Sequence, residues 1–184
     1  MKRIVLTYGL IAGAMLGGMM LISTAFIEQI GFDRGAIVGY TSMVAAFVMI
    51  FFGVRAYRDQ VLGGTIGFWA AMKAGLLIMV VASACYVATW EFVFYRMMPD
   101  FGERYMAYEL EKARANGASE ASLQAQEKET KAFYESYKNP LVNISFTFLE
   151  PLPVGLLITL VTAAGLSRKR RPPLGTSGAR ASTQ

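Results

Sequence analysis

Apolar residues occur in four long runs, separated by shorter polar stretches. The runs cover about residues 4–27, 36–54, 69–95 and 141–166. A helix needs about 20 residues to cross the roughly 30 Å hydrocarbon core of a bilayer, and soluble domains rarely contain even one such run. The pattern therefore predicts an all-α polytopic membrane protein with four transmembrane helices. We expect residues 1–171 to form a single membrane domain.

The first run also has features of a secretory signal peptide. Lys2 and Arg3 precede it, and Ser23-Thr24-Ala25 offers small residues at a position suited to cleavage. However, the apolar region of a signal peptide usually has about 7–15 residues, and this run has 24. We therefore expect the run to be retained as a transmembrane helix.

The polar stretch at about residues 99–139 predicts a helical hairpin between the third and fourth spans. Asn116-Gly117 is typical of a helix end, and Ser119 can cap a second helix. Aromatic residues recur at helical spacing near the base of the hairpin, at Phe101, Tyr105 and Tyr108. The tip, Asn116 to Lys128, is polar, and we expect it to be solvated.

Basic residues are distributed unevenly between the two sides of the predicted bundle. With the N-terminus inside, the inner side has ten Lys and Arg residues opposed only by Asp59, whereas the segment from Arg96 to Pro140 has seven basic and eight acidic residues. The positive-inside rule therefore predicts that both termini are cytoplasmic and that the hairpin is extracytoplasmic. We expect residues 172–184, which are rich in Pro, Gly, Ser and Thr, to form a disordered cytoplasmic tail. The inner-rim residues expected to contact anionic lipid headgroups are Arg55, Arg58, Lys73, Arg168, Lys169, Arg170 and Arg171.

Several classes of chemistry find no support in the sequence. It contains no histidine, which is the commonest general base and metal ligand, and its one cysteine, Cys85, lies in the middle of a predicted span. Gly63-Gly64-Thr65-Ile66-Gly67 lacks the Lys-Ser/Thr of a phosphate-binding loop. We therefore expect no catalytic, cofactor-binding or metal site. The net charge of +5 is accounted for by the inner rim, so we expect no nucleic-acid partner.

Two carboxylates within the predicted spans are candidate functional residues, because charge is costly in hydrocarbon. At 1.5 Å per residue, Glu91 and Glu150 both lie about 24–26 Å from the inner boundary. If they face each other, one would hold a proton and the pair could bind a cation or a basic segment. Alternatively they are hydrated near the interface, or they pair with Arg96, Arg34 or Arg104.

Proline and glycine patterns predict two features of helix geometry. Pro151 and Pro153 each lack a backbone donor, so we expect the fourth span to be kinked or broken. No matching break occurs in another span, as the repeats of a transporter would require. Gly9, Gly13 and Gly17 form one stripe on the first helix, which predicts close packing inside the bundle or, alternatively, homodimerisation.

Short motifs along the chain resemble those of a known bacterial family. They are Tyr8-Gly9-Leu10-Ile11, Phe52-Gly53-Val54-Arg55-Ala56-Tyr57-Arg58-Asp59, Gly63-Gly64, Phe68-Trp69 with Gly75, Pro99-Asp100, Asn139-Pro140 and Gly155. With them the chain resembles, over about Ile4 to Arg171, the membrane proteins grouped as domain-of-unknown-function family 4199. The resemblance implies a bacterial inner membrane and a four-helix layout. The family has no assigned activity, so the resemblance assigns no functional residues.

Two functional hypotheses follow from these patterns. The first is a non-enzymatic accessory or structural protein of the cell envelope, whose hairpin contacts another envelope protein or a second copy of the chain. The second is a small ion- or proton-coupled transporter that uses Glu91 and Glu150. A membrane enzyme ranks behind both, because nothing in the sequence brings reactive groups together.

Overall fold

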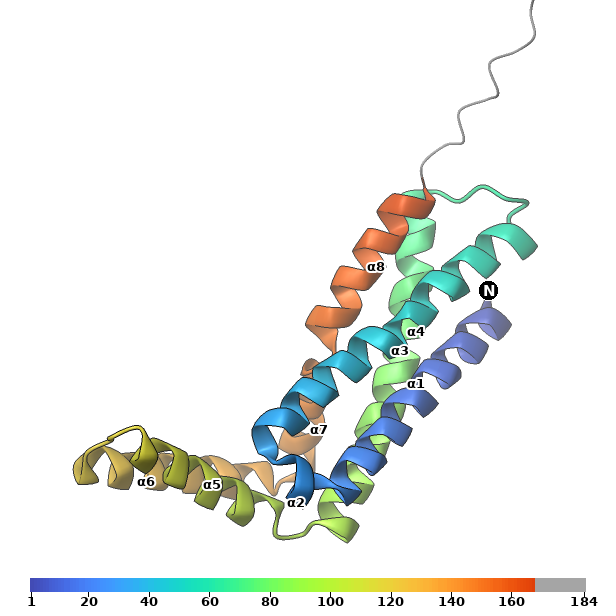
Figure 1. Cartoon of the computed structure of the whole chain (residues 1–184). Coiled ribbons are helices and arrows are strands. Elements are labelled where there is room, and N and C mark those ends of the chain that lie inside the picture. The colour runs from blue at the N-terminus through green and yellow to red at the C-terminus, as the bar shows by residue number, and fades with distance from the viewer. Residues whose placement is uncertain (168–184) are drawn as a thin grey trace, which may run out of the picture.

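The computed structural model describes residues 1–167, which fold into a helical bundle with a helical hairpin at one end (Figure 1). Four segments are long and apolar enough to cross a membrane, so the predicted all-helical class with four candidate spans is confirmed; they are Lys2–Ala25, Phe32–Gln60, Phe68–Met97 and Pro140–Leu166. The predicted tail at 172–184 and the basic residues from Arg168 to Arg171 lie outside the described part. The helices are α1 Lys2–Ala25, α2 Ile27–Ile30, α3 Phe32–Gln60, α4 Phe68–Phe92 with the π-helical turn η1 Val93–Met97, α5 Phe101–Ala115, α6 Glu120–Tyr137, α7 Pro140–Leu149 and α8 Leu152–Leu166.

Helix α4 is the centre of the bundle, since α1, α3 and α8 all pack against it. Consecutive spans run in opposite directions (Figure 1). The core contains many alanines together with a few larger side chains, such as the fully buried Phe47 and Ile50. Large apolar side chains such as Ile37, Leu157 and Val161 face outward. That outward apolar surface suits contact with lipid rather than water.

Helix α3 is longer at both ends than the predicted span of residues 36–54. It begins at Phe32 and ends at Gln60. Its first turn contains Asp33 and its last turn contains Arg58, and each charge is of the sign that stabilises its end of a helix. The prediction followed the apolar run, whereas the helix continues into the polar flanks. The stretch between the first two predicted spans contains most of α2, and Gly31, with a φ of 78°, lets the chain turn between α2 and α3.

The glycine stripe of α1 lies directly against α4. A Cβ added at Gly9, Gly13 or Gly17 would lie only 2.5–2.6 Å from a side-chain atom of Val81, Cys85 or Thr89, respectively. Side chains other than hydrogen therefore do not fit at these positions without movement of α4. The structure places the stripe inside the bundle, so a homodimer formed through the same stripe would require α4 to leave.

Helices α5 and α6 form the predicted hairpin. Gly117 has a φ of 83° at the turn, and the Ser119 hydroxyl accepts a hydrogen bond from the backbone N–H of Ser122 at 3.3 Å. The expected helix end and helix cap are thus both confirmed. The expectation of a fully solvated tip is wrong at Leu123, which is only 4% exposed. Because α5 packs along α6, one apolar side chain near the turn is buried between otherwise polar helices.

The predicted break in the fourth span is confirmed. Helix α7 ends at Leu149, and α8 begins at Leu152. The cause is Pro151 and Pro153, whose nitrogens cannot donate the hydrogen bonds that a continuous helix needs. Glu150 lies at this break.

We predict that Gly13→Ala destabilises the protein by about 1–3 kcal/mol, because the new methyl group would overlap the Cys85 side chain. The free energy of unfolding, measured by titration with denaturing detergent, reports the change. Gly18→Ala is the matched control, since Gly18 is on the same helix and a Cβ there meets nothing within 4 Å. Equal effects of the two substitutions would contradict the close approach of α1 and α4.

Candidate functional site

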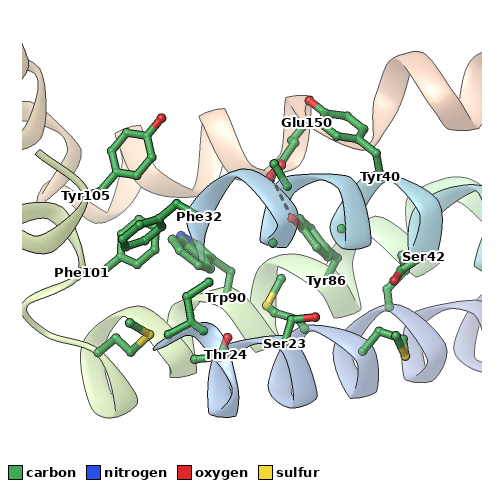
Figure 2. A pocket seen from close by; sticks show the side chains of 18 of the residues that line it. Ser23, Thr24, Phe32, Tyr40, Ser42, Tyr86, Trp90, Phe101, Tyr105 and Glu150 are labelled. Atoms are coloured by element: carbon green, nitrogen blue, oxygen red, sulfur yellow. Dashed lines mark hydrogen bonds between the residues drawn. The ribbon is translucent and has the colours of Figure 1, made fainter. Parts of the chain in front are cut away.

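A cavity of about 360 Å³ lies at the hairpin end of the bundle. The bundle contributes the ends of α1, α3 and α4, and the base of the hairpin closes it from the other side (Figure 2). Most of the lining side chains are aromatic or aliphatic. The polar lining side chains are Ser23, Thr24, Tyr40, Ser42, Tyr86, Trp90, Tyr105, Tyr137 and Glu150.

Glu150 is the one charged residue among those that line the cavity. It caps the C-terminal end of α7, at the proline break, so its side chain leaves the helix where the fourth span is interrupted. The Tyr86 hydroxyl, from the last third of α4, donates a hydrogen bond to Glu150 Oε2 at 2.8 Å (Figure 2). The carboxylate is thus oriented by a neutral donor.

A chain of hydrogen bonds joins α4, α6 and α7 beside the cavity. Trp90 Nε1 donates to the Tyr137 hydroxyl at 3.1 Å, and that hydroxyl lies 3.2 Å from Thr147 Oγ1. The Thr147 hydroxyl donates to Asn143 Oδ1 at 3.2 Å. Since Thr147 uses its proton there, Tyr137 is the donor to Thr147. Burial raises the pKa of Tyr137, so its phenol keeps the proton that this chain requires at neutral pH.

Aromatic rings join the hairpin to the bundle. The ring of Phe32, in the first turn of α3, lies 5.9, 5.5 and 5.1 Å, centroid to centroid, from the rings of Phe101, Tyr105 and Tyr108. Trp90 adds an edge-to-face contact with Phe101 at 5.1 Å. The predicted aromatic stripe of α5 therefore faces the bundle, where it also forms one wall of the cavity.

Two ion pairs between the hairpin and the bundle lie next to the aromatic contacts. Arg104 Nη2 lies 3.0 Å from Glu28 Oε1, and Lys112 Nζ lies 2.7 Å from Asp33 Oδ1. The hydrogen bond to Asp33 raises the pKa of Lys112. Arg104 was one expected partner of the intramembrane carboxylates, and the structure pairs it with Glu28 instead.

Glu91 and Glu150 do not share the site. Glu150 lines the cavity, whereas Glu91 is not among the lining residues. At 3.6 residues per turn, Glu91 points about 140° around α4 from Tyr86, the partner of Glu150. Glu91 Oε1 is buried, and it has no hydrogen-bond partner within residues 1–167. No group of three or more His, Cys, Asp or Glu residues that could hold a metal ion occurs in that part of the chain.

Inner-rim residues lie at the opposite end of the bundle from the hairpin, at the end of α3 and the start of α4 (Figure 1). Arg58 Nε lies 2.7 Å from Asp59 Oδ1, and Arg55 Nε lies 3.6 Å from Asp59 Oδ2. Lys73 is exposed. The remaining members of the predicted rim are outside the described residues.

Sequence reasoning did not identify Tyr86, Trp90 or Tyr137 as parts of the site. Tyr86 and Trp90 are four residues apart, so they lie on one face of α4, and this spacing was a usable signal. Their partners are distant in the sequence, since Tyr137 follows Trp90 by 47 residues. The pairing therefore needed the tertiary structure.

We predict that Tyr137→Phe destabilises the protein by about 1–3 kcal/mol, because the Trp90 N–H loses its acceptor in a part-buried site. Thermal unfolding in detergent measures the loss. In a Trp69→Phe background, Trp90 is the one tryptophan left, so a change in its fluorescence emission reports the loss of its hydrogen bond to Tyr137. The control is Tyr40→Phe, which removes an exposed hydroxyl without a hydrogen-bond partner among residues 1–167. A thermal stability unchanged by Tyr137→Phe would contradict the role of this chain.

A model of one known protein family matches the chain over almost the whole of the fold described above. A family described as a protein of unknown function, DUF4199, matches residues 7–168, which include the hairpin, the last three candidate spans and all but the first five residues of the first span. No curated protein and no solved structure matches the chain. The chain belongs to the DUF4199 family of proteins of unknown function.

Proposed function

We propose that this protein is a non-enzymatic component of the bacterial cell envelope that presents its hairpin to another envelope protein. In this proposal the bundle spans the cytoplasmic membrane with both termini inside, and the hairpin lies on the outer face. The inner rim contacts anionic headgroups. The support for this orientation is the strong excess of Lys and Arg at the end of the bundle away from the hairpin.

The observation that carries the proposal is that the hairpin is braced against the bundle. A two- to eight-residue connection would be enough to join two neighbouring helices. Here two helices, α5 and α6, stand between the third and fourth spans. The Phe32 aromatic cluster and the ion pairs of Arg104 and Lys112 hold them in one position. A fixed, folded projection of this kind suits a contact surface better than a simple linker.

The face of α6 away from the bundle is polar and carries both signs of charge. Its exposed residues do not take part in bracing the hairpin. They include Gln124, Glu127, Lys128, Lys131 and Glu135. A surface of this character is typical of the polar rim of a non-obligate protein interface, where charge patterning selects the partner.

We predict that a photo-crosslinking amino acid placed at Gln124 or Lys131 captures one envelope protein in high yield from native membranes. Both positions are exposed on α6. Phe32→Ala is expected to lower this yield severalfold, because each lost ring contact is worth about 0.5–1.5 kcal/mol of the bracing. Quantitative mass spectrometry of the crosslinked product gives the measurement.

Two controls make the crosslinking result specific. Phe26→Ala removes an exposed ring outside the cluster and should leave the yield unchanged. The same probe at Val161, on the outward face of α8, should capture no envelope partner. Recovery of the protein alone, or only of its own dimer, would argue against the accessory role, and capture of a cytoplasmic protein would argue against the orientation.

A second candidate function, ion- or proton-coupled transport, has support from the place of Glu150. A carboxylate in a cavity at membrane depth is a usual component of such pathways. Glu91, the other carboxylate expected to take part, does not line the cavity. Transport would thus depend on Glu150 rather than on a carboxylate pair.

If the protein transports protons, we predict that Glu150→Gln abolishes the flux, since glutamine cannot carry a proton on and off. Proteoliposomes with an internal pH-sensitive dye and an imposed potassium diffusion potential give the measurement. Glu91→Gln should retain most of the flux, because Glu91 is outside the cavity. Wild-type flux no greater than that of empty liposomes would remove this candidate.

A further inference from the structure

The cavity at the hairpin end has an unusual combination of lining residues. Seven of its nineteen lining residues are aromatic, and one, Glu150, is acidic, while none is Lys or Arg. On one side Phe32, Trp90 and Phe101 stand together, and Tyr86 with Glu150 faces them from the other side (Figure 2). Aromatic faces and a single carboxylate both attract positive charge.

Among residues 1–167, no Lys or Arg side chain forms an ion pair with Glu150. Arg104, from the nearby base of α5, is paired with Glu28, and Lys112 is paired with Asp33. The only side-chain hydrogen bond that Glu150 accepts within the described residues comes from the neutral Tyr86 hydroxyl. An ionised carboxylate at this depth is costly unless a cation compensates it.

The size of the cavity and its remaining lining residues limit the kind of cation that can bind there. A volume of about 360 Å³ is roughly ten times the approximately 30 Å³ that a water molecule occupies, so a bare metal ion would leave most of the cavity empty. Metal ions such as Ca²⁺ also prefer six or more oxygen ligands, whereas this lining is largely apolar. Met19, Met20 and Met98 add flexible, polarizable surface suited to alkyl groups.

We propose that this cavity is a binding site for a small lipophilic organic cation, such as a quaternary ammonium or a hydrophobic amine, with its charged centre between Glu150 and the aromatic rings. This inference does not rest on the proposed contact of the hairpin with a partner, because α6 residues exposed on the hairpin are not required for it.

The experiment uses the purified full chain in nanodiscs of zwitterionic phosphatidylcholine, which minimise charge at the membrane surface. Isothermal titration calorimetry compares benzyltrimethylammonium with 2-methyl-1-phenyl-2-propanol, a neutral molecule of nearly the same shape. We expect wild-type protein to bind the cation at least about tenfold more tightly than the alcohol. In Glu150→Gln this difference should disappear, while the Tyr86 hydroxyl retains an oxygen to which it can donate.

Two further variants keep the test decisive. Glu91→Gln removes the other intramembrane carboxylate, which lies on α4 and does not line the cavity, so it should retain wild-type selectivity for the cation. Trp90→Leu should weaken cation binding about two- to fivefold through loss of the cation–π contact, even if Glu150→Gln fails to fold. Equal binding of the two probes to wild-type protein, which a lipid-filled apolar cavity would give, overturns the proposal. So does unchanged selectivity in a folded Glu150→Gln protein, or in Trp90→Leu.

Discussion

The close approach of α1 and α4 determines how the rest of the bundle is arranged. In lipid, helices gain little from burying apolar surface, so their association depends on van der Waals contact between backbones that come near one another. The glycines of α1 permit that contact along the part of α4 from Val81 to Thr89. Since α3 and α8 also pack on α4, its position fixes where Tyr86 and Trp90 project. The packing of α1, α3 and α8 on α4 therefore also positions the α4 side chains that form one wall of the cavity.

The hairpin depends on contacts of a different kind. Outside the apolar spans, α5 is held to the bundle by aromatic edges around Phe32 and by charge pairs that water can reach. Exposed ion pairs contribute little to stability, so the rings are the larger part of the attachment. The cavity lies directly behind these rings. The attachment of the hairpin and the shape of the cavity therefore change together.

Features that depend on neighbouring residues could be predicted from the sequence, and features that join distant residues could not. The four spans, the turn at Gly117, the cap at Ser119 and the break at Pro151 each follow from backbone chemistry within a few residues. Glu150 could be identified because charge is rare in an apolar run. Its partner Tyr86, however, is 64 residues away. A single apolar residue such as Leu123 has no periodicity that would reveal its burial.

The break between α7 and α8 also alters how water and lipid meet the protein. Because Pro151 and Pro153 have no N–H, the main-chain carbonyls of Thr147 and Leu149 lose the donors that a continuous helix would supply. These acceptors lie at the level of Glu150, which favours hydration there. Helix α8 alone, with 15 residues, is only about 22 Å long. Apolar side chains of α7 such as Leu141 and Leu149 also face outward, so the fourth span needs both helices to cross the roughly 30 Å apolar layer, and this polar level lies inside it.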